Sequence, residues 1–165
     1  MPAERYYFPK ELQEGNTITL DGVEFHHLIN VMRNRVNDSV ELINGLGQLA
    51  KAKITQLEKK CGYLQVETIF QEPQLEKPLI LAQAIPRLSK LEIILEKATE
   101  LGMTEVWLFP SSHSEKKEFS ENQSDRLRTI LIAAMKQSGR LFLPDLIIMP
   151  PLKQWQPLCL PAYFG

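Results

Sequence analysis

This sequence lacks long hydrophobic runs, a signal core and all but two cysteines. No apolar run approaches the length needed to cross a bilayer, and the first residues carry no apolar core of the kind found in secretory signals. The two cysteines, Cys61 and Cys159, lie far apart and without metal-ligand spacing. We therefore expect free thiols in a reducing compartment, a cytoplasmic protein, and neither a membrane nor a metal among its partners.

An excess of positive charge is missing as well. Lys and Arg number 19 against 20 Asp and Glu, which gives a formal net charge of −1. Proteins that coat nucleic acid non-specifically usually carry a large positive excess, so the composition argues against that class. The composition does not exclude a protein that binds nucleic acid through a local basic patch on one surface.

Several catalytic motifs are also absent. The sequence contains neither G-x-G-x-x-G nor G-x-x-x-x-G-K-[ST], which argues against the common dinucleotide and phosphate loops. It contains neither G-x-S-x-G nor H-E-x-x-H, and its three histidines lack metal spacing with carboxylates or thiols. A small-molecule α/β enzyme, a hydrolase and a metalloenzyme are therefore all disfavoured.

The first half of the chain has the pattern of β structure. Short segments alternate apolar and polar residues and are joined by turns, which is typical of a small antiparallel barrel or sandwich. Apolar residues recur at helical spacing between the first two strands, from Phe25 to Met32, so a short helix is expected there. The expected strands cover residues 17–20, 39–44, 49–58 and 62–70.

A proline-containing, charged segment near residues 71–78 predicts a linker between a domain at 1–72 and a domain at 73–165. The second half then alternates strands and helices, which predicts a parallel sheet with right-handed crossovers. Ligands in such sheets gather at the carboxyl ends of the strands. The expected elements are strands at 79–85, 104–109 and 145–150, and helices at 89–101 and 120–138.

Further details of this second half can be predicted from its residues. The run 79–85 is continuously apolar, as in a strand buried on both faces. Ser89 and Glu92 match a capping box, and Gly102 stands where a left-handed residue ends a helix. Three strands make a thin sheet, so an incomplete α/β domain is expected. The buried stripe of the first helix is expected to consist of Leu91, Ile94, Leu95, Ala98 and Leu101.

At two places on the helices, the residues can be explained either by helix structure alone or by a role in function. Lys97 and Glu100 share a separate stripe of the first helix, which is either a solvated face or a face that packs on something else. Arg140 follows the second helix, where it either complements the helix dipole or serves as a fixed cation near a substrate base or phosphate. Gln137 would then act as donor and acceptor beside it.

Aromatic and cationic side chains gather near the N-terminus. Bases stack on aromatic rings and phosphates pair with cations, so this set suits RNA, although the same residues occur on many inert surfaces. The set consists of Arg5, Tyr6, Tyr7, His26, His27, Arg33 and Arg35.

Several segments, in order and spacing, resemble those of a known family. They are "RYYFP", "FHHLINVMR", "INGLGQLAKAKI", "LAQAIPRLSKLEIILEKATELGMTEV" and "AAMKQSGRLFLPDL". Together they look like the RsmE family, methyltransferases that modify N3 of a uridine in small-subunit ribosomal RNA. The resemblance runs over essentially the whole chain, and "KATELG" and "QSGR" are its most specific parts.

The resemblance implies an α/β fold class with an N-terminal all-β domain. Residues 1–72 would form a PUA-like RNA-binding β-barrel, and residues 73–165 the N-terminal part of a SPOUT methyltransferase domain, which in the family ends in a trefoil knot. The family acts as a homodimer on small-subunit ribosomal RNA or the 30S subunit, with S-adenosylmethionine as methyl donor.

The resemblance also implies roles for particular residues. Arg140 would stabilise the charge that develops on the uridine, and Gln137 would orient the base. Lys97 and Glu100 would support them or contact RNA, and Ser114 would contact RNA from the loop that follows the second strand of the sheet. The implied RNA-binding set is Arg5, His27, Arg33, Lys97, Glu100 and Ser114.

The sequence departs from the family pattern at several positions, which limits the residue roles that the resemblance implies for this chain. The family's glycine-rich "GPEGG"-like segment has no counterpart here, so the cofactor-binding residues are expected beyond Gly165. His113 stands where an arginine is usual, and Lys136 where an acid is usual. An RNA-binding module without catalysis is therefore the alternative to a methyltransferase.

Overall fold

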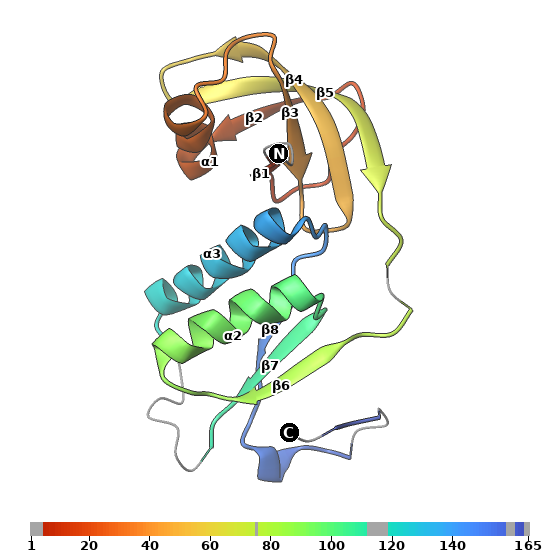
Figure 1. Ribbon diagram of the computed structural model, residues 1–165, viewed down its shortest axis with the longest axis vertical. Helices are drawn as coiled ribbons and strands as arrows, with labels where there is room; N and C mark the ends of the chain where they lie inside the picture. The colour runs from red at the N-terminus through yellow and green to blue at the C-terminus, as the bar shows by residue number, and fades with distance from the viewer. Residues whose placement is uncertain (1–4, 75, 112–118, 158–160, 164–165) are drawn as a thin grey trace.

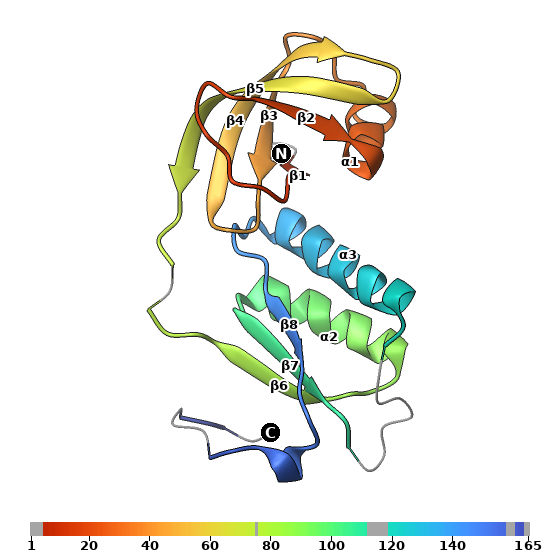
Figure 2. The same ribbon diagram turned by 180° about the vertical axis from the view of Figure 1, so that it is seen from behind.

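The computed structural model describes residues 5–74, 76–111, 119–157 and 161–163. The chain folds into a curled five-stranded sheet followed by a three-stranded sheet with two helices (Figures 1 and 2). In the described part of the chain, no helix has the length and apolarity that a membrane span requires.

The N-terminal sheet has the strand order β1-β3-β4-β5-β2, so β1 and β2 form its edges and the predicted barrel is a curled, open sheet. Its neighbours pair antiparallel, except that β1 and β3 are parallel. Alternate residues of β4 point inward, and Ala50, Ala52 and Ile54 are fully buried, as the alternation predicts. The strands are β1 (Arg5–Tyr7), β2 (Thr17–Asp21), β3 (Ser39–Ile43), β4 (Gln48–Leu57) and β5 (Cys61–Gln71).

The predicted helix between β2 and β3 is present but changes its winding. It begins as α1 (Gly22–His26) and continues as the π-helix η1 (His27–Val31). Phe25 and Leu28 are buried as expected, whereas Met32 is 39% exposed. The wider π turn, closed by the N–H of Met32 donating to the carbonyl of His27 at 3.1 Å, displaces Met32 from the apolar stripe that regular spacing predicts.

The second sheet is parallel, as predicted, and its strand order is β6-β7-β8. Both helices cover one face of it (Figures 1 and 2). Val106 and Leu108 of β7 are buried beneath them, and Trp107 and Phe109 on the other face contact Trp155. The elements are β6 (Ile80–Ala84), α2 (Leu88–Leu101), β7 (Glu105–Phe109), α3 (Glu121–Ser138), β8 (Asp145–Ile148) and the short η2 (Leu152–Gln154).

Three predictions for this half were wrong in detail. None of the five residues of β6 is fully buried, because among the described elements β6 is an edge strand covered by helices on one face only. The capping box at Ser89 is not formed: Arg87 is the N-cap of α2, so Ser89 lies inside the helix. Leu101 is 70% exposed, and Thr99 is buried in its place, with its hydroxyl donating to the carbonyl of Leu95 at 2.8 Å.

A small apolar cluster joins the two halves. Ile43 of β3, Met135 of α3 and Leu141 are each at most 5% exposed and pack together. The backbone is tied at the same place, since the N–H of Gly47 donates to the carbonyl of Leu141 at 3.0 Å. β5 ends at Gln71 and β6 begins at Ile80; the domain boundary between residues 72 and 73 stays a prediction.

The N-cap of α3 offers a test of these helix assignments. Ser120 and Gln123 form a capping box, in which the N–H of Ser120 donates to Oε1 of Gln123 at 3.1 Å. Ser120→Ala is expected to lower the free energy of unfolding by about 1 kcal/mol in chemical denaturation. Ser89→Ala, inside α2, is the matched control and should change it by less than about 0.5 kcal/mol. Equal losses would contradict the assignment.

Candidate active site

The two predicted catalytic residues lie at the end of α3. Gln137 is exposed on its last turn, and the helix ends at Gly139, whose φ of 80° is left-handed. Glycine suits this position because a Cβ is unfavourable at such an angle. Arg140 follows directly, which places its side chain just outside the helix end.

Arg140 binds the neighbouring helix. Its Nη2 donates to the backbone carbonyl of Glu100 at 3.2 Å, in the last turn of α2. The guanidinium lies on the C-cap of that helix, because a Cβ built on Gly102 would stand 2.8 Å from Cζ of Arg140. Arg140 therefore complements the C-terminal end of α2, where carbonyls lack partners, and not that of its own helix.

Lys97 and Glu100 form an ion pair on the outer side of α2. Nζ of Lys97 donates to both carboxylate oxygens of Glu100, at 2.9 and 3.0 Å, and to Glu96 at 2.8 Å. The bonds to Glu96 and Glu100 raise the pKa of Lys97, and Lys97 lowers the pKa of Glu96. Since the shifts move these pKa values away from neutrality, the groups stay ionised across the physiological range.

Glu100 thus links the two predicted sites. Its side chain binds Lys97, and its backbone carbonyl accepts from Arg140. Ile93, on the neighbouring surface of α2, is 53% exposed. The structure therefore brings Lys97, Glu100 and Arg140 together around one helix end.

Of the predicted RNA-binding residues, Arg5 lies in the junction between the halves. Its Nε donates to Glu41 of β3 at 3.0 Å, and its side chain is only 19% exposed. Its Nη1 is buried without a hydrogen-bond partner among the described residues, and it would be 3.3 Å from a Cβ on Gly139. Arg5 therefore binds Glu41 within the protein. Its role in RNA binding stays a prediction.

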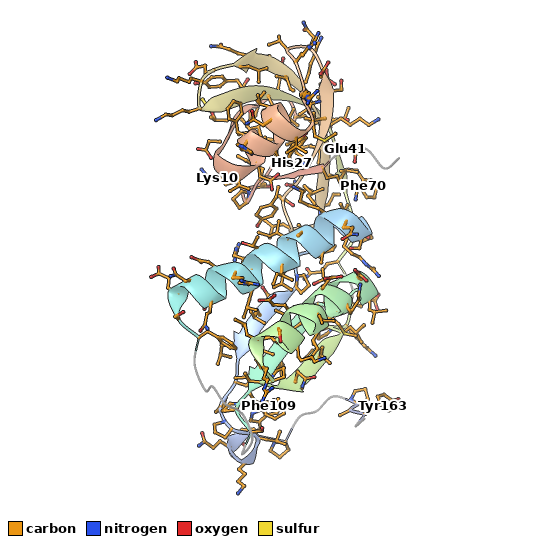
Figure 3. The ribbon with its side chains drawn as sticks, turned by 60° about the vertical axis from the view of Figure 1, so that its left-hand side comes forward. Lys10, His27, Glu41, Phe70, Phe109 and Tyr163 are labelled. Atoms are coloured by element: carbon orange, nitrogen blue, oxygen red, sulfur yellow. The ribbon has the colours of Figure 1, made fainter. Side chains whose placement is uncertain are left out.

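The other members are dispersed. His27 is half-buried in η1, with its ring edge-on to Tyr6 at 5.9 Å, and Figure 3 shows it inside the N-terminal domain. Arg33 is exposed in the segment after η1, with an unusual left-handed φ of 57°. Ser114 and His113 lie outside the described residues, so the contact predicted for their loop has no structural test.

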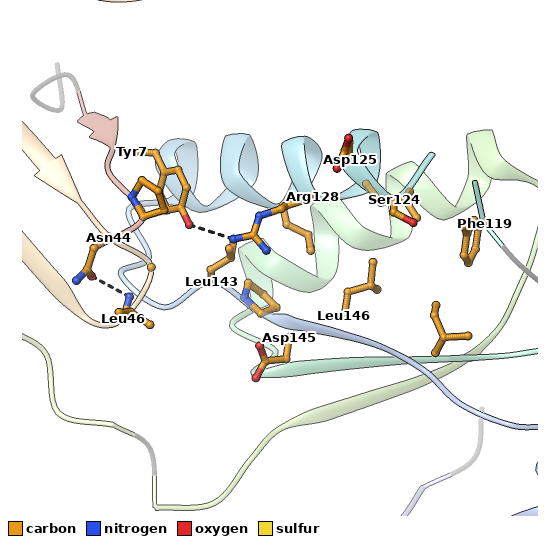
Figure 4. Close-up of a pocket in the computed structure, with 16 residues that line it drawn as sticks. Tyr7, Asn44, Leu46, Phe119, Ser124, Asp125, Arg128, Leu143, Asp145 and Leu146 are labelled. Carbon is orange, nitrogen blue, oxygen red and sulfur yellow. Dashed lines mark hydrogen bonds between the residues drawn. The ribbon is translucent and has the colours of Figure 1, made fainter. Parts of the chain in front are cut away.

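A cavity of about 450 Å³ opens between the two halves (Figure 4). Tyr7 and Asn44 line it from the first half, and Arg128 and Asp145 from the second. Nη2 of Arg128 donates to Oη of Tyr7 at 3.5 Å, so the cavity has a polar wall that spans both domains. Neither Arg128 nor Asp145 belongs to a motif that would have predicted this site.

A second cavity of about 650 Å³ lies on the N-terminal domain beside α1. Lys59 and Lys60 line it together with Asp21 and His26, so two cations and one acid lie at its wall. Two adjacent lysines in the turn between β4 and β5 are the signal that could have revealed it in the sequence. Among the described residues, no group of three or more His, Cys, Asp or Glu side chains could hold a metal ion.

Comparison with known proteins identifies the family. The model of a family described as an RNA methyltransferase domain matches residues 73–159, and that of an RNA methyltransferase PUA domain matches residues 20–67. The first match alone covers more than half of the chain. The chain belongs to the RsmE family of RNA methyltransferases.

Two relatives of this RsmE-family chain share one name with each other. Ribosomal RNA small subunit methyltransferase E of Synechocystis is 31% identical over 82% of the chain, and that of Bacillus subtilis is 27% identical over 92%. The crystal structure of the Neisseria gonorrhoeae enzyme bound to S-adenosyl methionine superposes with a TM-score of 0.78, at 29% identity, and covers 88% of the chain.

The chain spans 44%, 62% and 62% of the lengths of these three proteins. The predicted fold class is confirmed: an all-β, PUA-like N-terminal part precedes an α/β domain of the SPOUT methyltransferase type. The contact of Arg140 with Gly102 and Glu100 further joins "QSGR" and "KATELG", two of the segments on which the resemblance was based.

Gly102→Ala tests whether Gly102 makes room for Arg140. Any residue with a Cβ is strained at its φ of 86°, at a cost of about 1–2 kcal/mol, and here the Cβ also displaces the guanidinium. We expect a larger loss of unfolding free energy than for Gly15→Ala. Gly15 has a similar φ of 79° with no atom within 4 Å, so it is the matched control. Equal losses in the two variants would contradict the contact.

Proposed function

We propose that the protein transfers a methyl group from S-adenosylmethionine to N3 of a uridine in small-subunit ribosomal RNA. The observation that carries the proposal is the contact of Arg140 with α2, which joins two of the segments on which the resemblance was based at one site. The names of the relatives support the substrate class, and the cofactor of the Neisseria gonorrhoeae enzyme supports the methyl donor.

Arg140 is suited to stabilising the charge that develops on the base. The proton on uridine N3 must leave, and negative charge then spreads over N3, O2 and O4. A fixed cation stabilises this charge more in the transition state than in the ground state, which is what accelerates a reaction. A guanidinium has five N–H donors, so a bond to the carbonyl of Glu100 can hold the group in place and leave donors for the base.

Gln137 lies three residues before Arg140 on the exposed last turn of α3. Its amide can both donate to a carbonyl oxygen of the uracil and accept from N3–H, so it can orient the base edge. Lys97 supports the site indirectly, because its bonds to Glu100 restrain the end of the helix whose carbonyl accepts from Arg140.

The described residues form only part of a cofactor site. Trp155 and Phe109, with ring centroids 5.2 Å apart near the carboxyl end of β7, offer an aromatic surface suited to a purine. Neither Trp155 nor Phe109 lines either of the cavities described above, so no residue is assigned to the cofactor. When bound, S-adenosylmethionine supplies a methyl group on a sulfonium, which is already activated for transfer.

RNA would also bind the N-terminal domain. Arg33 is exposed there and Lys59 and Lys60 line the second cavity, so cations are available for phosphates. We further propose that the protein acts in the cytoplasm on the small subunit, as a homodimer.

The proposal is tested by incubating the full-length protein with unmodified 30S subunits and S-adenosylmethionine carrying a labelled methyl group. The RNA is then digested, and the nucleosides are identified by mass spectrometry. Labelled 3-methyluridine is the expected product. RNA binding without transfer of label would favour the alternative, a binding module without catalysis, and label on another atom would overturn the N3 assignment.

In this assay, Arg140→Ala is expected to reduce kcat by about a hundredfold or more, the typical effect of removing one donor from a developing anion. Arg126→Ala is the control, because Arg126 is also an exposed arginine that ties α3 to α2, through Glu92 at 2.6 Å. It should keep nearly full activity. Unchanged turnover in Arg140→Ala, with folding verified by circular dichroism, would contradict the role.

Replacing Arg33 should weaken RNA binding and flatten its salt dependence. A phosphate contact contributes a slope of about −0.7 to −0.9 to log K against log salt, so Arg33→Asn should flatten the slope by about that amount. Asn is chosen because it tolerates the left-handed angle of residue 33. Arg5→Ala should lower stability, since Arg5 is paired with Glu41, and it should also flatten the slope if Arg5 contacts a phosphate as predicted. An unchanged slope in Arg33→Asn would count against a phosphate contact.

A further inference from the structure

Lys136 of α3 and Glu24 of α1 form an ion pair between the two domains. Nζ of Lys136 donates to Oε1 and Oε2 of Glu24, at 3.0 and 2.8 Å, across 112 residues of sequence. The side chains are only 22% and 20% exposed. Salt therefore screens this pair less than it would an exposed one, and removing one partner would leave the other partly buried and unpaired.

On the N-terminal side, the pair is connected to the segment that carries Arg33. The backbone N–H of Tyr7 donates to Oε2 of Glu24 at 3.1 Å, which holds the carboxylate against β1. Nζ of Lys136 also lies 5.8 Å from the centre of the Tyr6 ring. Oη of Tyr6 in turn donates to Oδ1 of Asn34 at 2.9 Å, directly beside Arg33.

On the other side, the pair is connected to the candidate active site. Lys136 directly precedes Gln137 and lies about one helical turn before Arg140. The side chain of Met135, the residue before it, is fully buried in the apolar junction. The last turn of α3 therefore carries both the interdomain ion pair and the proposed catalytic end.

The ion pair adds a point of attachment between the domains to the apolar junction and to the bond of Arg128 with Tyr7. At the apolar junction, the loop after β3 meets the chain after α3 through the bridge of Leu46 with Phe142. The ion pair reaches a different element of the N-terminal domain, α1, which lies to the left of the descending hairpin of β3 and β4 in Figure 1. Several attachments oppose a rotation that one would allow.

We infer that Lys136 and Glu24 are a positioning pair, which holds the Arg33 segment of the N-terminal domain at a fixed separation from Arg140. The inference rests on the proposed function, since it supposes one RNA that contacts both domains. Two contacts on a rigid body bind such an RNA more tightly than the same contacts on domains that move independently, because the second contact forms at a higher effective concentration.

The test compares variants of the full-length protein. Lys136→Met and Glu24→Gln each remove the ion pair, and Gln keeps an acceptor for the N–H of Tyr7. Each should raise the Kd and the KM for ribosomal RNA by about tenfold, while kcat at saturating RNA and the affinity for S-adenosylmethionine change less than about twofold. Lys136→Arg can still bind the carboxylate and should restore most of the affinity.

The double variant and a control separate positioning from a loss of charge. Because the two residues form one contact, Lys136→Met with Glu24→Gln should bind RNA no worse than either single variant. Lys153→Met removes an exposed lysine of η2, far from the N-terminal domain, and should leave RNA affinity unchanged. Additive losses in the double variant, or wild-type affinity in both single variants, would overturn the inference.

Failure of the inference is distinguishable from failure of the proposed function. If the unsubstituted protein transfers no methyl group, the function fails, and direct RNA binding still tests the pair. If it is active and Lys136→Met has an unchanged KM for RNA, the pair is structural only. A fall in the melting temperature with unchanged RNA affinity of the folded protein leads to the same conclusion.

Discussion

The burial of Met135, Ile43 and Leu141 in one small cluster is the contact on which the arrangement of this molecule depends. Each half has its own apolar core, and this cluster lies between them. It fixes the last turn of α3 against the strand that ends at Ile43. A buried side chain in such a cluster can hardly shift without opening a void, so the turn has little freedom relative to either sheet.

The consequence is that one turn of helix serves three purposes. Its apolar side joins the domains, Lys136 reaches α1, and the chain that leaves it carries Arg140 to the end of α2. The cation at that helix end is stabilised by carbonyls that would otherwise lack partners. The attachment of the two domains and the position of Arg140 are therefore consequences of the same packing.

Local patterns in the sequence predicted most of the elements that surround this turn. Alternation located β2 to β5, the helical stripes located α2 and α3, and Gly102 and Gly139 marked the helix ends at left-handed angles. The segment Arg5–Tyr7 was missed because three residues are too few to alternate and its parallel partner is β3. Ser89 and Ser120 show the limit of motif reading, since both fit a capping box and only Ser120 lies at a helix start.

The sequence by itself determined the two domain types, the order of their elements and the family, because periodicity and short motifs depend on near neighbours. It also named Arg140 and Glu100 as candidates, without showing that they meet. Only the tertiary structure decided that Arg140 binds the carbonyl of a residue 40 positions away and that Lys136 pairs with Glu24, 112 positions away. Such contacts result from the packing of two helices and two sheets, and no local pattern in the chain specifies them.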